Sequence, residues 1–199
     1  MDIAQQQDLP IGTGALWRAA VALMAITLGL FGFSYSLLSS GIDGVLFPYH
    51  AHGSILLRDG KPVASELVAQ PFAAPGYFQP RPSAAKYDPM NAAGSNLART
   101  NPDLRKQVAQ LRDEIARRDG IAPAQVADDL LTQSGSGVDP DISVQAAMQQ
   151  VVRVARARDV PDADVRRLVD ANTRAPQFGI FGPARVNVVR LNLALDAHR

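Results

Sequence analysis

The chain of 199 residues contains no cysteine and only three histidines. Without cysteine it can form no disulfide, no thiolate nucleophile and no cysteine-ligated zinc or iron–sulfur site. Its 20 Lys and Arg residues nearly balance its 19 Asp and Glu residues, whereas nucleic-acid binding requires a concentrated excess of basic side chains. The composition therefore excludes cysteine chemistry and predicts no nucleic-acid partner.

The motifs of common catalytic and nucleotide sites are also missing. The sequence has no Walker-type phosphate loop and no dinucleotide-binding fingerprint. Ser136 lies between glycines, but the nucleophile elbow of hydrolases needs glycine two residues away on each side, where this chain has Ser134 and Val138. His50 and His52 have no further ligands nearby, so we interpret them as solvated or interfacial. We predict no catalytic residue and no metal site.

One long apolar segment is present near the N-terminus. Residues 19–42 contain no charged side chain, and about 20 helical residues cross the roughly 30 Å hydrocarbon core of a bilayer. Trp17 and Tyr35 are placed as interfacial aromatics, and Arg18 as a headgroup anchor. We predict a transmembrane helix over 19–42, preceded by a short tail over 1–18.

Small residues line one face of this predicted helix. Such a face lets another helix approach closely, so we expect it to pack against a helix of a partner. The residues of this small-residue face are Ala22, Ala25, Gly29 and Gly32.

The positive charges nearest to the apolar segment predict its orientation. Arg18 precedes the segment, and the first Lys or Arg after it is Arg58. The positive-inside rule then predicts a cytoplasmic N-terminus and a C-terminal domain outside the cytoplasm. A cleaved signal peptide is the alternative to an uncut span, with Ser39-Ser40-Gly41 as its cleavage site, but the apolar region of a signal peptide is usually only about 7–15 residues long.

The remaining residues, 43–199, predict a single soluble α+β domain. Its length of about 155 residues is sufficient to bury one core. Asp59-Gly60 between two short apolar runs predicts a β-hairpin. Capping residues and apolar periodicity predict helices over 102–119, 143–159 and from 161 onward, and alternating apolar residues predict a strand over 186–195.

A long segment between the hairpin and the first helix, residues 70–101, is rich in Pro, Gly, Ser and aromatics with little periodicity. Such stretches are uncommon in compact domains and are usually functional or partner-bound. We therefore take 77–97 as a candidate interface, with an irregular loop packed on its own domain as the alternative. Residues 134–140 allow three interpretations: a tight turn with a helix cap, a partner-docking surface, or an anion site built from backbone N–H groups. The candidate interface residues are Tyr77, Phe78, Arg81, Ser83, Gly94, Ser95, Asn96, Ser134, Ser136 and Asp139.

Five segments in order form a pattern that is more specific than any single motif. They are YFQPRPSA at 77–84, GSNL at 94–97, SGSGVDP at 134–140, RVARAR at 153–158, and RVNV with LNLALD within 185–196. Together with the apolar segment they resemble the C subunit (KdpC) family of the bacterial high-affinity potassium-transporting P-type ATPase.

The resemblance implies a non-catalytic accessory subunit that assembles and stabilises an ATP-driven potassium uptake complex in the bacterial inner membrane. The implied partners, besides the lipid bilayer, are a channel-like potassium-binding subunit and a P-type ATPase subunit. The chain has neither the Asp-Lys-Thr-Gly-Thr phosphorylation motif nor a Thr-Val-Gly-Tyr-Gly-like filter, so hydrolysis and conduction are expected in those partners.

The resemblance also implies that the subunit raises the affinity of the ATPase subunit for ATP, with Gln70 as the nucleotide candidate and no firmly bound cofactor. Direct contact with cytoplasmic ATP would contradict the orientation predicted from Arg18. The residues alone leave two other classes open: a membrane-anchored envelope enzyme with a site near Ser95, Asn96 and Ser136, and an envelope binding protein.

Overall fold

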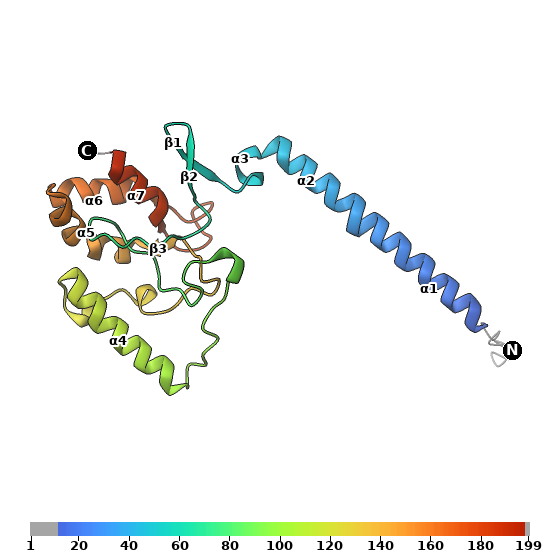
Figure 1. Cartoon of the computed structure of the whole chain (residues 1–199), viewed down its shortest axis with the longest axis horizontal. Helices are drawn as coiled ribbons and strands as arrows, with labels where there is room; N and C mark the ends of the chain where they lie inside the picture. The colour runs from blue at the N-terminus through green and yellow to red at the C-terminus, as the bar shows by residue number, and fades with distance from the viewer. Residues whose placement is uncertain (1–11, 198–199) are drawn as a thin grey trace. The chain divides into compact units, whose positions relative to one another are not determined.

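The computed structural model describes residues 12–197, and the chain divides after His52 into a helical N-terminal unit and a compact domain (Figure 1). The architecture is α+β, as predicted, with one long apolar helix and a domain of helices and two small sheets. Residues 1–11 of the predicted N-terminal tail lie outside the described residues.

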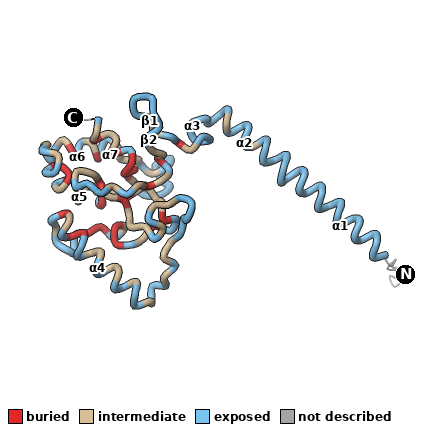
Figure 2. The backbone as a smooth tube through the Cα atoms, viewed as in Figure 1, coloured by how far each residue is buried: buried red, intermediate tan, exposed pale blue. Residues whose placement is uncertain are grey.

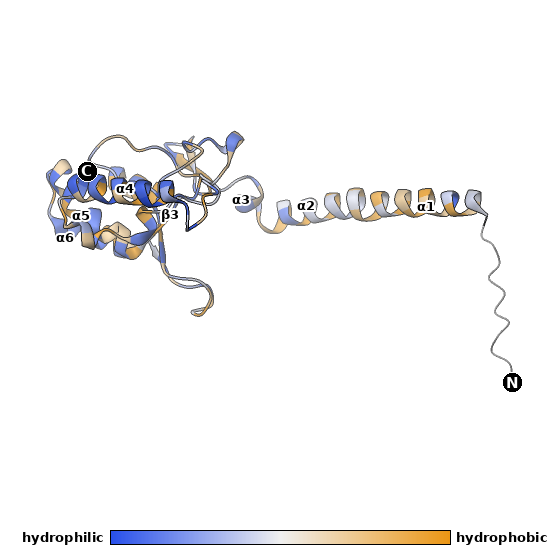
Figure 3. Ribbon diagram, turned by 90° about the horizontal axis from the view of Figure 1, so that it is seen from below, coloured by the Kyte–Doolittle hydropathy of each residue, from blue (hydrophilic) through white to orange (hydrophobic). Residues whose placement is uncertain are grey.

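The apolar segment forms one continuous helix, Thr13–Leu46, that is long and apolar enough to cross a membrane. It consists of α1 (Thr13–Thr27), a π-helical stretch over Leu28–Ser34 and α2 (Tyr35–Leu46). Apolar residues are distributed along most of it (Figure 3), and none of its residues is buried (Figure 2). A short helix, α3 (Pro48–Ala51), follows.

The π-helical stretch contains both glycines of the small-residue face. A π-turn leaves carbonyl groups out of the regular α-helical pattern, and unsatisfied carbonyls are costly in hydrocarbon. Here Ser34 donates its hydroxyl to the Gly29 carbonyl at 2.8 Å, and Ser36 donates to the Gly32 carbonyl at 2.6 Å. Both serine hydroxyls are therefore bonded within the helix itself and need no partner outside it.

The β-hairpin at the start of the domain is confirmed. Strands β1 (Ile55–Arg58) and β2 (Lys61–Ser65) pair antiparallel. The turn residues Asp59 and Gly60 both have positive φ, 52° and 74°, as in a type I′ turn whose twist matches that of the strands.

The core of the domain lies among three helices and a second sheet (Figure 2). The helices are α5 (Val144–Arg158), α6 (Asp162–Ala171) and α7 (Val188–Ala197), and the antiparallel sheet has the order β3 (Asp141–Ser143), β5 (Arg185–Asn187), β4 (Thr173–Arg174). Helix α4 (Pro102–Asp119) buries only its C-terminal end in this core. Three 3-10 turns complete the described elements: Pro89–Asn91, Pro123–Gln125 and Asp128–Leu130.

Both ends of α4 and the start of α5 follow from their capping residues and lie where the sequence predicts them. The side chain of Asn101 accepts a hydrogen bond from the Asp103 N–H at 2.8 Å, and Gly120 ends α4 in the left-handed conformation. Ser143 caps α5 by accepting from the Ala146 N–H at 3.0 Å.

The predicted strand over 186–195 is wrong beyond its first residues, because α7 occupies Val188–Ala197. The apolar alternation there is equally compatible with helical spacing, and Asn187 decides between them: its side chain accepts from the Arg190 N–H at 3.0 Å, which caps a helix. The buried residues then repeat at helical spacing. They are Val188, Val189, Leu191, Asn192 and Leu195.

Candidate functional site

The irregular segment 70–101 is bonded to its own domain by two buried side-chain amides. Asn192 of α7 accepts from the Phe78 N–H and donates to the Phe78 carbonyl, each at 2.9 Å. Gln150 of α5 accepts from the Gln79 N–H at 2.8 Å and donates to its carbonyl at 3.2 Å. Each side-chain amide thus bonds both the backbone N–H and the backbone carbonyl of one residue, as a neighbouring strand would in a sheet. Phe78, a candidate interface residue, is fully buried in the core.

Arg81 links the irregular segment to the turn region that precedes β3. Its guanidinium donates to the Asp129 carbonyl at 3.2 Å and to the Thr132 hydroxyl at 3.2 Å. It also forms an ion pair with Asp139 at 3.3 Å. Arg81 and Asp139, both candidate interface residues, are therefore brought together, and they are only partly exposed.

Ser83 and Ser134 connect the same two regions through the backbone. The Ser83 hydroxyl donates to the Gly137 carbonyl at 2.5 Å and accepts from the Tyr87 N–H at 2.9 Å. The Ser134 N–H donates to the Pro82 carbonyl at 3.0 Å. These bonds hold residues 134–137 directly against 82–87.

Two glycines permit this close packing. A Cβ on Gly137, which has φ +74°, would lie 2.6 Å from the Ala85 Cβ and 2.6 Å from the Ala93 carbonyl oxygen. A Cβ on Gly94 would lie 2.9 Å from the Gly135 carbonyl oxygen. Residues 134–140 thus form a tight turn packed on 82–94, the first of the three interpretations given above.

The N-terminus of α5 is already occupied by a carboxylate of the chain itself. Asp129 accepts from the Ser143 N–H at 2.7 Å and from the Ser143 hydroxyl at 2.9 Å. A helix N-terminus favours negative charge, and Asp129 supplies it here. Because Asp129 already occupies this helix N-terminus, the helix dipole is not available to attract an external anion to residues 134–140. The anion-site interpretation therefore loses this support.

A second polar cluster gathers around Asp196 at the end of α7. Its carboxylate accepts from the Tyr77 hydroxyl at 3.0 Å and pairs with Arg58 and Arg158, each at 2.8 Å. The Arg158 guanidinium also lies 4.8 Å from the centre of the Tyr77 ring. Burial alone would raise the pKa of Asp196, but the hydrogen bonds from Arg158, Arg58 and Tyr77 outweigh it and lower the pKa.

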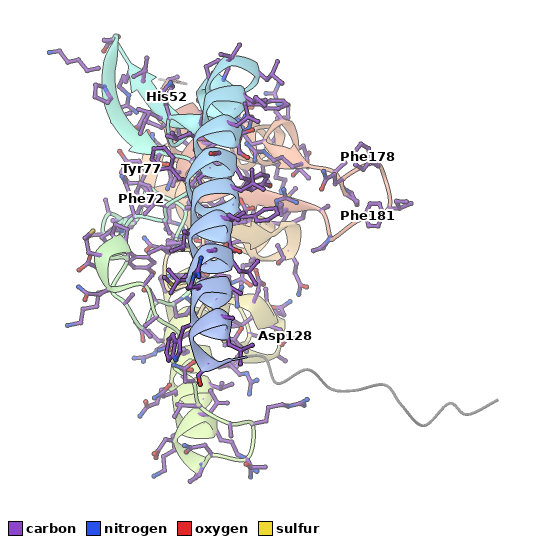
Figure 4. All side chains as sticks on the ribbon, turned by 90° about the vertical axis from the view of Figure 1, so that its right-hand side faces the viewer. His52, Phe72, Tyr77, Asp128, Phe178 and Phe181 are labelled. Carbon is purple, nitrogen blue, oxygen red and sulfur yellow. The ribbon has the colours of Figure 1, made fainter. Side chains whose placement is uncertain are left out.

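Next to this cluster lies a cavity of about 350 Å³, within the usual range for small ligands. Gln70, the nucleotide candidate, is one of its lining residues. The rings of Phe72 and Tyr77 lie 5.5 Å apart at its wall (Figure 4). The charged side chains that line it, Arg58 and Asp196, are paired with each other, so their charges largely cancel.

A third cluster fixes the end of α4 to α5. The buried carboxylate of Asp119 pairs with Arg153 and Arg118, each at 2.8 Å, and accepts from Gln149 at 3.0 Å. Arg153 also donates to the Tyr77 carbonyl at 3.0 Å. Burial raises the pKa of Asp119, but these charged and amide donors lower it further than burial raises it.

The remaining candidate residues lie apart from any reactive grouping that the described residues reveal. The Ser136 hydroxyl accepts from the Val138 N–H at 3.2 Å, as in a serine turn. Ser95 is half-buried and Asn96 is exposed with φ 52°. Within residues 12–197, no group of three or more His, Cys, Asp or Glu side chains could hold a metal ion.

Over residues 12–197, these observations define a structural class: a protein with one helix able to cross a membrane and an α+β domain whose charged side chains form ion pairs within the domain. The comparisons with known proteins identify the family within that class. The family model described as KdpC, the c chain of K⁺-transporting ATPase, matches residues 17–197.

Curated relatives agree over nearly the whole chain. The potassium-transporting ATPase KdpC subunit of Xanthomonas campestris pv. campestris (strain B100) is 54% identical over 189 residues, covering 95% of this chain and 90% of the relative. The KdpC subunit of Shewanella putrefaciens is 48% identical, covering 90% and 88%, and that of Caldanaerobacter subterraneus is 40% identical, covering 89% and 93%. The chain belongs to the KdpC family. It is a subunit of a potassium-transporting P-type ATPase complex and no enzyme by itself.

Proposed function

We propose that the chain is a non-catalytic accessory subunit that assembles and stabilises an ATP-driven potassium uptake complex in the bacterial inner membrane. Its N-terminus lies in the cytoplasm and its domain outside. Its partners are the channel-like potassium-binding subunit and the P-type ATPase subunit, KdpB. One observation supports this proposal above the others: no residue of the helix Thr13–Leu46 is buried, and its glycines are open to a neighbour.

The small-residue face supplies the contact in this proposal. A Cβ on Gly29 or Gly32 would meet nothing within 4 Å in this chain, so space for a second helix is available at both positions. Helix pairs in membranes gain van der Waals contact where small residues let the backbones approach. The face therefore favours a helix of the channel-like subunit as its neighbour.

A matched pair of substitutions tests the contact. Ala22→Leu adds bulk to the small-residue face, whereas Ala20→Leu adds the same bulk about 200° around the helix. We expect Ala22→Leu to reduce the amount of chain that co-purifies with a tagged channel-like subunit and to lower high-affinity potassium uptake, and Ala20→Leu to leave both unchanged. The proposal would be rejected if, in cells that lack this chain, the other two subunits still assembled fully and high-affinity potassium uptake were unchanged.

A second function, direct contact with ATP near Gln70, is supported by the 350 Å³ cavity and by the aromatic rings of Phe72 and Tyr77 at its wall. It would raise the affinity of KdpB for ATP. This function requires a cytoplasmic domain, so it and the proposed orientation exclude each other.

The orientation is measurable at one introduced thiol, because the chain has no cysteine. Met90 is 88% exposed, so Met90→Cys should fold normally and react readily. We expect a membrane-impermeant thiol reagent to label Met90→Cys in intact cells. Labelling only after the inner membrane is permeabilised would instead favour the ATP contact, and Gln70→Ala should then raise the KM of the complex for ATP without changing its assembly.

A further inference from the structure

The connection between β4 and β5 forms a short hairpin of its own. Gln177 and Phe181 exchange two backbone hydrogen bonds, each at 2.9 Å. Three residues, 178–180, lie between them, and Phe178 and Gly179 have positive φ, 54° and 76°, which gives a tight turn. The Gly179 and Ile180 N–H groups also bond within the hairpin, at 2.9 and 3.2 Å. The tip therefore satisfies most of its backbone donors without water.

The side chains at this tip are large, apolar and exposed. Phe178 is 83% exposed, Ile180 is 75% exposed and Phe181 is 61% exposed. The two phenylalanine rings contact each other edge to face, with centroids 6.5 Å apart, and project from the hairpin away from the rest of the domain (Figure 4). Residues 175–184 contain no charged side chain. A contiguous exposed apolar patch of this kind marks a site that contacts a protein, a ligand or a membrane.

Arginines stand at both ends of the uncharged stretch. Arg174 pairs with Glu66 at 3.1 Å and Arg185 pairs with Asp141 at 2.8 Å. Their side chains remain 38% and 40% exposed, so both guanidinium groups can still reach an anionic group beside the hairpin. Aromatic side chains bordered by basic residues are typical of segments that enter the headgroup region of a membrane.

The spanning helix of this chain places a membrane surface close to the domain. Only eight residues, 47–54, separate the end of α2 from the start of β1, and they can extend over less than about 30 Å. The bilayer that holds the spanning helix is therefore always within reach of the domain, whereas a protein partner is present only after assembly. Internal bonding of most backbone N–H groups at the tip also reduces the free-energy penalty for entering the membrane interface.

We propose that the hairpin 176–183 is a second membrane contact, with Phe178, Ile180 and Phe181 entering the interfacial region of the bilayer and Arg174 and Arg185 facing anionic headgroups. The proposal rests on the proposed function only for the membrane anchoring of the helix. It requires no other subunit. The contact restricts how the domain turns on its short link.

The test uses the full chain, in which any introduced cysteine is unique. Phe178→Cys is labelled with an environment-sensitive fluorophore, and Met90→Cys, at an 88% exposed residue elsewhere on the domain, is the matched control. Both are reconstituted into vesicles of phosphatidylcholine and phosphatidylglycerol. One set of vesicles contains lipids with a nitroxide quencher in the upper acyl chain, and a second set receives aqueous iodide.

An interfacial side chain lies about 5–10 Å below the headgroup boundary, so we expect the nitroxide lipids to remove about half of the emission at position 178. Emission there should also shift to shorter wavelength, and iodide should quench only position 90. Iodide quenching at both positions would overturn the proposal. Protection of position 178 from both quenchers would also overturn it, because the side chain would then be covered by protein, either its own chain or a second copy. Because no partner subunit is present, either failure leaves the assembly proposal to its own test.

Discussion

Glycines play opposite roles in the two units of this chain. In the helix Thr13–Leu46, a Cβ on any glycine would meet nothing within 4 Å. In the domain, a Cβ on Gly94 or Gly137 would collide with backbone atoms of another segment. The domain thus uses its small residues to pack against itself, whereas the helix leaves them unused within this chain. This difference is the one expected if, as proposed, the helix packs against another subunit.

The largest expected effect on the domain comes from its buried ion pair. Asp119→Ala removes the carboxylate that faces Arg153, whose side chain is only 9% exposed, and leaving a buried charge without its partner costs about 4 kcal/mol. Urea unfolding of the full chain in detergent, followed by hydrogen exchange of α5 amides, measures the loss. Asp113→Ala on the exposed side of the same helix is the control and should stay within about 0.5 kcal/mol of the parent.

The same pair gives the domain a defined dependence on acid. The pKa of Asp119 is lowered in the fold, so its contribution is fully present above the unfolded pKa of about 4. As the pH falls through the folded pKa, that contribution is lost. Unfolding free energy should therefore decrease below about pH 4 in the parent chain and decrease less steeply in Asp119→Asn. Equal slopes in the two chains would show that the carboxylate is not coupled to folding.

The glycine comparison is tested directly at the turn 134–140. Gly137→Ala places a methyl group 2.6 Å from two atoms at a positive φ and should cost about 3 kcal/mol. Gly135→Ala, where a Cβ meets nothing within 4 Å, is a matched control two residues away. Thermal unfolding of both variants distinguishes tight packing from simple loop flexibility, since a flexible loop would tolerate both.

Removing a buried amide should have a moderate effect. Asn192→Leu leaves the Phe78 N–H and carbonyl without their partners, which costs about 2 kcal/mol. Gln110→Ala on the exposed face of α4 is the control. If Asn192→Leu were as stable as the parent, the irregular segment would not depend on this amide, and 77–97 would be freer to bind a partner.

The smallest effect on folding is expected in the helix. Gly32→Leu adds four carbon atoms at an open position, so the unfolding free energy of the domain should change by less than about 0.5 kcal/mol. Co-purification of the chain with the channel-like subunit should nevertheless fall. If the Gly32→Leu variant assembled as well as the parent, the helix glycines would have no role in subunit contact.

Most regular elements could be predicted from the sequence because their determinants are local. Asp59-Gly60 specifies a hairpin turn, and Asn101, Gly120 and Ser143 mark helix ends through bonds to neighbours in the chain. The prediction of a C-terminal strand is wrong because alternation and helical spacing coincide there, and only the bond from the Arg190 N–H to the Asn187 side chain distinguishes a helix.

The internal clusters could not be predicted because they join residues far apart in sequence. Asn192 and Phe78, or Asp196 and Arg58, meet only in the folded chain. One local indication existed: Gln150 and Asn192 are polar residues on otherwise apolar helix faces, and buried polar groups require partners. The sequence also shows the segment of Phe178 and Phe181 as an uncharged run, but it does not show that these side chains are exposed.

The mass of the mature chain shows whether the membrane helix stays uncut and joins this domain to the transport complex. The complex should be purified from membranes through a tag on the ATPase subunit, and the co-purified chain weighed by intact mass spectrometry. We expect a chain that still contains Thr13–Leu46 and is bound to both other subunits. A chain cleaved after Ser40 and recovered free in the soluble fraction would contradict it.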